Sequence, residues 1–103
     1  MTGYLVDFEQ LEWTSPLPGV RHKVQRVGGN ILRLVEYSPT MVAHWCEGGH
    51  LGSILAGRVE IKFAGETLEF AAWDGVAIPS GVENRHRARA PTEAVRALFI
   101  EEL

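Results

Sequence analysis

The sequence predicts a single all-β domain folded as a small antiparallel β-barrel. No stretch of a dozen residues repeats apolar side chains every 3.6 positions, as an amphipathic helix would. Short segments rich in Val, Ile, Leu and Phe are instead separated by turns that contain glycine or proline. Within residues 58–63, three apolar side chains alternate strictly with three charged ones. This alternation indicates a strand with one face in the core and the other in water.

The first thirty residues are the least regular part of the chain. Pro16 and Pro18 lack backbone N–H groups, so the segment around them cannot be a central strand. We therefore expect residues 1–29 to form an N-terminal arm and an edge strand, with extended structure over 20–27. His22 lies between two basic residues and is expected to be an exposed strand residue.

Residues 30–100 are expected to form the barrel core of one domain that spans residues 1–103. A chain of this length buries one modest core but not two. Gly57 permits a tight turn of positive φ between two strands. In chain order, the expected strands are residues 31–37, 41–46, 51–56, 58–63, 68–70, 76–78 and 94–100.

The side chains that share the inward face of these strands predict the core. A glycine-containing turn at residues 64–67 has the length of a hairpin connection, and the alternation resumes after it. Emptying the Phe63 site is expected to cost about 3–5 kcal/mol. The expected core consists of Val59, Ile61, Phe63, Leu68, Phe70, Ile78, Val95, Ala97 and Phe99.

Composition excludes several classes of protein. The chain is 46% hydrophobic and 22% charged, and no apolar run approaches the ~20 residues of a membrane span. The N-terminus has no basic region followed by an apolar core, which favours a cytoplasmic protein. Arg85, Arg87 and Arg89 alternate like the outer face of a strand and have no aromatic residues among them, so we expect no nucleic-acid binding. A single cysteine cannot form a disulfide within the chain.

Potential metal ligands gather in one short stretch. If residues 44–50 run as strand, Gly-rich turn and strand, alternation places His44 and Cys46 on one face. The turn then brings His50 back towards them. Two imidazoles and a thiol fixed in this way suit a borderline or transition metal. The alternative is a pair of hydrogen-bonded histidines beside a small buried cysteine.

From about residue 30 to residue 100 the chain resembles a small single-domain cupin, of a variant with a His-Trp-Cys and Gly-His first motif. Gly57 matches the glycine that ends the first cupin motif. Counting back from it places His50 where the family usually has its glutamate, and Cys46 and His44 at its two histidines. The resemblance implies a jelly-roll or double-stranded β-helix barrel.

The second cupin motif is matched by the turn at residues 79–81, and Trp73-Asp74 stands at the usual Gly-Asp position before it. Asn84 falls where the family's histidine is expected, and His86 follows two residues later. Either side chain is a candidate for this position.

The predicted metal site consists of His44, Cys46, His50 and His86, which together hold one divalent transition metal ion. A donor set of imidazole and thiolate favours zinc, copper, nickel or ferrous iron over magnesium or manganese. Because Gly52 has no side chain, it is expected to leave space for a bound molecule. Glu47 is the one nearby carboxylate for general-base chemistry, although such a loop residue is more often simply solvated.

Three functional classes remain open. The first is a metal-binding module that holds a small-molecule ligand in the barrel without chemistry. The second is a metal-dependent enzyme, of isomerase or dioxygenase type, acting on a small organic substrate. The third is a metal-free structural barrel. A homodimer is expected in each case, because sheet edges and apolar residues of the arm, including Trp13, Leu17 and Val20, need cover.

Overall fold

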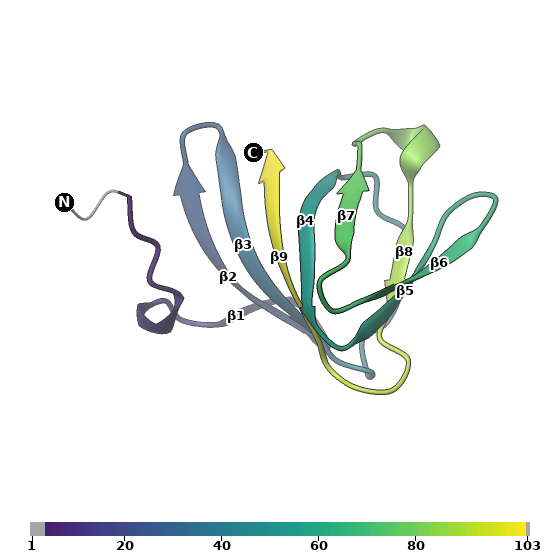
Figure 1. Ribbon diagram of the computed structural model, residues 1–103, viewed down its shortest axis with the longest axis horizontal. Helices are drawn as coiled ribbons and strands as arrows, with labels where there is room; N and C mark the ends of the chain where they lie inside the picture. The colour runs from purple at the N-terminus through teal and green to yellow at the C-terminus, as the bar shows by residue number, and fades with distance from the viewer. Residues whose placement is uncertain (1–3, 103) are drawn as a thin grey trace.

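The computed structural model describes residues 4–102 and confirms the all-β prediction (Figure 1). Two short 3-10 helices, η1 (Phe8–Gln10) and η2 (Val82–Asn84), accompany the strands. No helix of the described residues is long and apolar enough to cross a membrane. The strands are β1 (Thr14–Leu17), β2 (Val20–Val27), β3 (Asn30–Tyr37), β4 (His50–Ala56), β5 (Arg58–Lys62), β6 (Thr67–Ala71), β7 (Gly75–Ile78), β8 (Arg87–Arg89) and β9 (Val95–Glu102).

The strands form two antiparallel sheets of a jelly roll. The larger sheet has the order β1-β2-β3-β9-β4-β7, and the smaller has the order β6-β5-β8. In Figure 1 the sheets approach each other at the bottom of the view and diverge towards the top. We call these the closed end and the open end. β4 and β9 are neighbours in the larger sheet, and Figure 1 shows both extending between the closed end and the open end.

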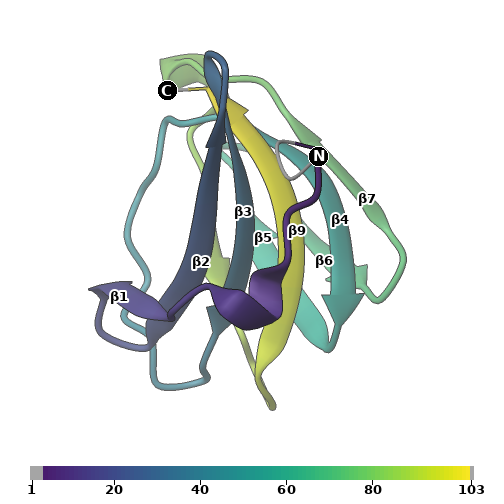
Figure 2. The same ribbon diagram turned by 90° about the vertical axis from the view of Figure 1, so that its left-hand side faces the viewer.

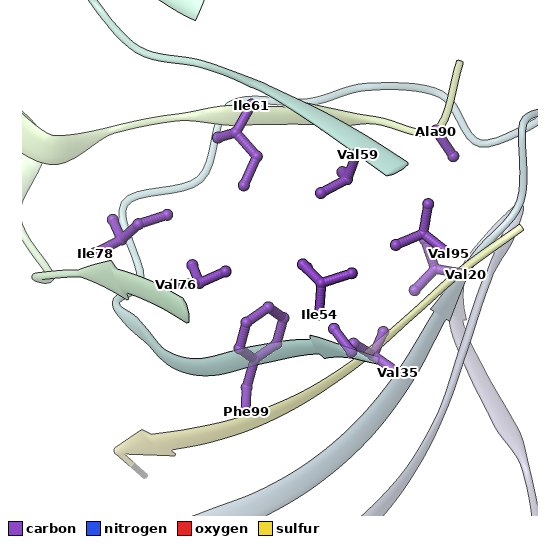
Figure 3. Close-up of a cluster of buried hydrophobic side chains, with 11 residues drawn as sticks. Val20, Val35, Ile54, Val59, Ile61, Val76, Ile78, Ala90, Val95 and Phe99 are labelled. Carbon is purple, nitrogen blue, oxygen red and sulfur yellow. The ribbon is translucent and has the colours of Figure 1, made fainter. Parts of the chain in front are cut away.

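The core lies between the sheets and is almost entirely aliphatic (Figure 3). Six of the nine predicted core residues are buried, and Phe63 and Phe70 pack against them while partly exposed. The prediction for Leu68 is wrong, since its side chain is 41% exposed. Leu68 lies on β6, the edge strand of the smaller sheet, where the larger sheet does not cover it. Val20, expected on the surface of the arm, is also buried.

Most predicted strands are present, with one exception. Residues 41–45 form no strand, and Cys46 makes only an isolated bridge to His86. The backbone at Met41 turns instead, because its N–H donates to the Ser38 carbonyl. The tight turn at Gly57 is confirmed by a φ of 83°. The loss of regular structure over residues 41–45 means that strand alternation does not place His44.

The N-terminal segment crosses the outer face of the larger sheet. Figure 2 shows η1 in front of β3 and β9. The Lys23 ammonium donates to the Phe8 carbonyl at 2.6 Å and holds this segment in place. Trp13 packs under two cationic side chains, with the Arg21 guanidinium 4.2 Å and the Lys23 ammonium 4.9 Å from its ring centroid.

Candidate metal centre

Three potential metal ligands converge at the open end of the barrel. Cys46, His50 and His86 each offer one ligand atom, and these atoms lie within 4.8 Å of one another. Cys46 and His86 belong to the isolated bridge between two otherwise irregular segments, while His50 is the first residue of β4. A thiol and two imidazoles at this spacing match the requirements of a divalent ion with nitrogen and sulfur ligands.

Backbone hydrogen bonds fix the positions of these three residues. Cys46 and His86 exchange both N–H to carbonyl bonds, at 2.8 and 2.9 Å. Gly81 donates to the Glu47 carbonyl at 2.9 Å, so the turn of the second motif is tied to the loop that follows Cys46. His50 is opposite Ile78 in the β4–β7 ladder. The site is therefore built before any ion binds, which limits the ordering entropy lost on binding.

His86 has a buried ring nitrogen, Nε2, that has no hydrogen-bond partner in the described part of the chain. The residue is 3% exposed, and its Nδ1 lies 3.1 Å from the Asn84 carbonyl oxygen. Since that oxygen only accepts, Nδ1 carries the proton and Nε2 has a free lone pair. Burial lowers the pKa of His86, which keeps the imidazole neutral. A neutral imidazole with an unused buried lone pair is suited to metal coordination.

His50 is oriented by a carboxylate that the sequence analysis did not identify. Its Nδ1 lies 2.5 Å from Oε2 of Glu101, and the same oxygen accepts from Nη1 of Arg33 at 3.3 Å. Burial alone would raise the pKa of Glu101, but the hydrogen bond from His50 and the charge of Arg33 lower it overall. The ionised carboxylate therefore keeps the proton on Nδ1 and leaves the other nitrogen of His50 for a ligand.

Strand alternation contained a signal for Glu101. It shares the inward face of β9 with Val95, Ala97 and Phe99, which the sequence analysis had already assigned to the core. Glu101 occupies the next inward position after Phe99, where the apolar residues of the pattern end and a charged residue begins.

His22 belongs to the same polar group and is not an exposed strand residue. It is half-buried, and its Nδ1 accepts a hydrogen bond from Nε of Arg33 at 2.8 Å. Burial is the main cause of its lowered pKa, and the Arg33 charge adds to the effect. A continuous chain of contacts thus runs from His22 through Arg33 and Glu101 to His50.

The other predicted site residues lie around the three convergent ligands. His44 is exposed and lines the pocket but stays outside the group of three. His86 belongs to the group of three, and the backbone carbonyl of Asn84 accepts a hydrogen bond from its Nδ1. Glu47 is exposed. Gly52 does not leave space for a ligand, because a Cβ there would lie 1.9 Å from the Leu98 carbonyl oxygen. Close strand packing explains this glycine.

The convergent ligands face a cavity of about 550 Å³ between the two sheets. This volume is within the range of small-molecule sites, roughly 300–1,000 Å³. Its walls towards the closed end are aliphatic, and polar side chains gather near the candidate ligands. The polar lining includes Asn30, Arg33, Tyr37, Cys46, His50, Ser80, His86 and Glu101.

Comparison with solved structures identifies the fold. KdgF from Halomonas sp. has a TM-score of 0.76 and 18% identity, over 99% of this chain and 96% of that one. A sugar phosphate isomerase of the cupin superfamily from Silicibacter pomeroyi has a TM-score of 0.77 and 14% identity, over 96% and 75% of the chains. A cupin-2 domain from Rhodospirillum rubrum has a TM-score of 0.74 and 22% identity, over 95% and 73%.

These similarities show that the chain has the jelly-roll fold of a small cupin, as its sequence motifs predicted. A scan of the sequence against protein-family models found no match. A search of curated proteins likewise found no relative. The function must therefore be argued from the site itself.

Proposed function

We propose that this small cupin binds one divalent transition metal ion through Cys46, His50 and His86 and thereby holds a small organic ligand in its barrel. The observation that supports this most directly is the buried Nε2 of His86, which has no hydrogen-bond partner among residues 4–102. A buried nitrogen without a hydrogen bond costs about 1–3 kcal/mol. Coordination of an ion between His86, His50 and Cys46 offsets that cost.

The residues around the candidate ligands support the same proposal. Metal-bound histidines usually donate their second N–H to a carboxylate or a carbonyl oxygen. His50 donates to Glu101 and His86 donates to the Asn84 carbonyl, so both imidazoles have this arrangement. Phe99 lies 4.9 Å from His50, centroid to centroid, and restricts rotation of its ring.

The donor set indicates the kind of metal. Two neutral imidazoles and a thiolate favour zinc, iron, nickel or copper, while magnesium and manganese prefer oxygen ligands. The thiol remains available as a ligand in a reducing compartment, in keeping with a cytoplasmic protein. When bound, such an ion supplies a Lewis-acid centre with coordination positions open to a ligand.

The first test is the metal content of protein purified without chelator, followed by titration of chelator-treated protein with Co²⁺. We expect about one equivalent of transition metal and a visible Co²⁺ spectrum with a thiolate charge-transfer band. Cys46→Ser should remove that band, and His86→Leu should abolish binding. Full metal retention in a His50→Ala, His86→Leu double variant would contradict the proposal.

His44→Ala distinguishes two possible ligand sets. The three-residue site predicts that this variant keeps its Co²⁺ affinity within about threefold, because His44 is exposed and lies outside the convergent group. A loss as large as that caused by His50→Ala would make His44 the fourth ligand, as the sequence motif alone suggested. His22→Ala serves as a control for removing a histidine elsewhere in the barrel.

A second candidate function is catalysis by the metal-loaded protein. Three protein ligands with open coordination positions are typical of catalytic rather than structural zinc sites. One of the structurally similar proteins is a sugar phosphate isomerase. An isomerisation by proton transfer should incorporate deuterium from D₂O into an added ketose or aldose phosphate, detectable by NMR. Incorporation in the wild type that is absent from His86→Leu would establish an enzyme.

We also propose that the chain forms a homodimer through the outer face of its larger sheet. Leu51 and Ile100 are opposite each other in the β4–β9 ladder, and their side chains are 59% and 48% exposed. Adjacent exposed apolar side chains of this size favour burial against a partner. Light scattering should give twice the monomer mass of 11.4 kDa at tens of micromolar, and Ile100→Glu should give the monomer.

A further inference from the structure

Arg33 is a largely buried cationic side chain at the open end of the barrel, beside the candidate metal centre. Its side chain is 15% exposed and lines the cavity. A guanidinium has five N–H groups, and the contacts with His22 and Glu101 use two of them. Glu101 is shared, because its Oε2 also accepts from His50. Arg33 therefore has donors to spare in a place where water is partly excluded.

Tyr37 is a second hydrogen-bond donor in the pocket that contains Arg33. Its side chain is partly buried and lines the same cavity as Arg33, Cys46 and Glu101. Burial raises the pKa of Tyr37 and keeps the phenol protonated. A neutral O–H group beside a guanidinium provides hydrogen-bond donors suited to an oxyanion.

We propose that the pocket selects small organic anions, whose carboxylate pairs with Arg33 and Tyr37 while a second oxygen of the same molecule binds at the metal centre. This inference rests on the proposed function, since it adds the ligand class to the same site. The one shared oxygen of Glu101 links the guanidinium to His50, which places the two anchor points a few carbon atoms apart.

The charges of the interior favour an anion. Cupins with the usual motif place a carboxylate among the ligands, and this chain has His50 at that position. A divalent ion bound by two neutral imidazoles and one thiolate keeps a positive charge. Arg33 and Glu101 largely offset each other, and Glu102 lies at the exposed rim. The interior of the loaded protein is therefore positive, and a neutral ligand would leave that charge uncompensated.

The remainder of the cavity restricts the body of the ligand. Its lower walls consist of aliphatic side chains such as Ile54, Val59 and Val76, which offer no hydrogen bonds. Hydroxyl groups placed against these walls would lose their hydration without replacement, so the polar groups of a ligand are expected at the open end. A short carbon chain with polar groups at one end satisfies both parts of the cavity.

The inference is tested with Co²⁺-loaded protein and three probes: 3-hydroxybutanoate, 4-oxopentanoate and 5-oxohexanoate, each compared with its methyl ester. Binding is measured by calorimetry and by the change in the Co²⁺ spectrum, so no enzymatic activity is needed. We expect at least one acid to bind and to perturb the spectrum. Its methyl ester should bind with an affinity lower by a factor of about ten or more. Arg33→Gln should remove this preference, and Arg33→Lys should retain part of it.

The outcomes separate this inference from the proposed function. If Co²⁺ does not bind at Cys46, His50 and His86, the metal site itself is wrong. If Co²⁺ binds but acids and esters bind equally, or none of the acids binds, the ligand class is overturned and the metal site stands. Co²⁺ affinity of Arg33→Gln is measured in parallel, because an equal loss of metal and acid would assign Arg33 to positioning His50 through Glu101. Tyr37→Phe should weaken binding of the acid and leave the Co²⁺ affinity unchanged.

Discussion

The closed and open ends of the barrel are built by the same strands but serve different purposes. On β9 the inward positions are Val95, Ala97 and Phe99 towards the closed end and Glu101 at the open end. On β4 they change from Ile54 to His50. The strands are continuous from one end to the other, so the change of inward residues from apolar to polar, together with the divergence of the sheets, distinguishes the site from the packed core. The closed end stabilises the fold, whereas the open end leaves a buried nitrogen unsatisfied.

The largest expected effect is on stability at the closed end. Ile54 is 1% exposed, and Ile54→Ala should lower the free energy of unfolding by about 2–5 kcal/mol through lost burial and a residual cavity. Urea denaturation of metal-free protein measures this value. The Co²⁺ affinity of the folded variant should stay within about threefold of the wild-type value, because Ile54 is not one of the candidate metal ligands.

His86→Leu is the matched change at the open end. It removes the unsatisfied Nε2 and should leave the metal-free protein as stable as the wild type or more stable, while abolishing Co²⁺ binding. If His86→Leu destabilised the metal-free protein as much as Ile54→Ala, His86 would be an ordinary core residue and the distinction between the two ends would fail.

The next effect concerns the carboxylate that orients His50. Glu101→Gln keeps the shape of the side chain but removes its charge, and it should weaken Co²⁺ binding by about 10–100-fold. Competition with a chromophoric chelator measures the affinity. Glu102→Gln is the control, because it changes a neighbouring carboxylate on the exposed side of β9. Equal affinities in both variants would show that Glu101 contributes only to the fold.

Sequence reasoning predicted the closed end better than the open end, for a physical reason. Apolar alternation identified β5, the β5–β6 hairpin and the inward face of β9, because burial of aliphatic side chains obeys strand periodicity. The prediction that Leu68 is buried failed because Leu68 lies on an edge strand that the opposite sheet does not cover. Which residues face inward can be predicted from sequence. How far the opposite sheet extends cannot, since it depends on tertiary packing.

At the open end, the motif spacing pointed to Cys46 and His50 in the first motif and to Asn84 in the second, with His86 two residues later as the alternative. The structure brings Cys46, His50 and His86 together. The motif spacing did not give the position of His44, since the loop over residues 41–45 follows no period. It also missed Arg33, whose role depends on pairing with a residue 68 positions away. Local patterns contain no information on such long-range charge pairs.

A smaller effect is expected in the turn between β6 and β7. Trp73 has a φ of 73°, its N–H donates to the Ile54 carbonyl at 2.8 Å, and its side chain is 82% exposed. A left-handed conformation costs a non-glycine residue roughly 1–2 kcal/mol, and the greater flexibility of glycine in the unfolded chain cancels part of the gain. Trp73→Gly should therefore raise the unfolding free energy by about 0.5–1 kcal/mol. Trp73→Ala keeps its Cβ and should give no such increase.

The smallest effect is the pH dependence of an ion pair on the outside of the barrel. Glu36 on β3 accepts hydrogen bonds from Arg21 on β2 and Arg96 on β9. Burial alone would raise the pKa of Glu36, but these two bonds and the charges of both guanidinium groups lower it overall. The folded state therefore binds this proton less readily than the unfolded state. The interactions of Glu36 with Arg21 and Arg96 stabilise the protein at pH values above 4.5, the pKa of Glu36 in the unfolded chain. This contribution is lost as the pH falls through the lower pKa of the folded state.

Glu36→Gln should accordingly lower the unfolding free energy at pH 7 by about 1 kcal/mol or less, and the difference from wild type should vanish in more acidic solution. Urea titrations between about pH 3 and pH 7 measure both quantities. Added salt should shrink the difference at pH 7, because water reaches the two guanidinium groups. A difference that persisted at acidic pH would mean that Glu36 contributes through packing rather than charge. Glu36 would then contribute in the same way as the aliphatic side chains of the closed end.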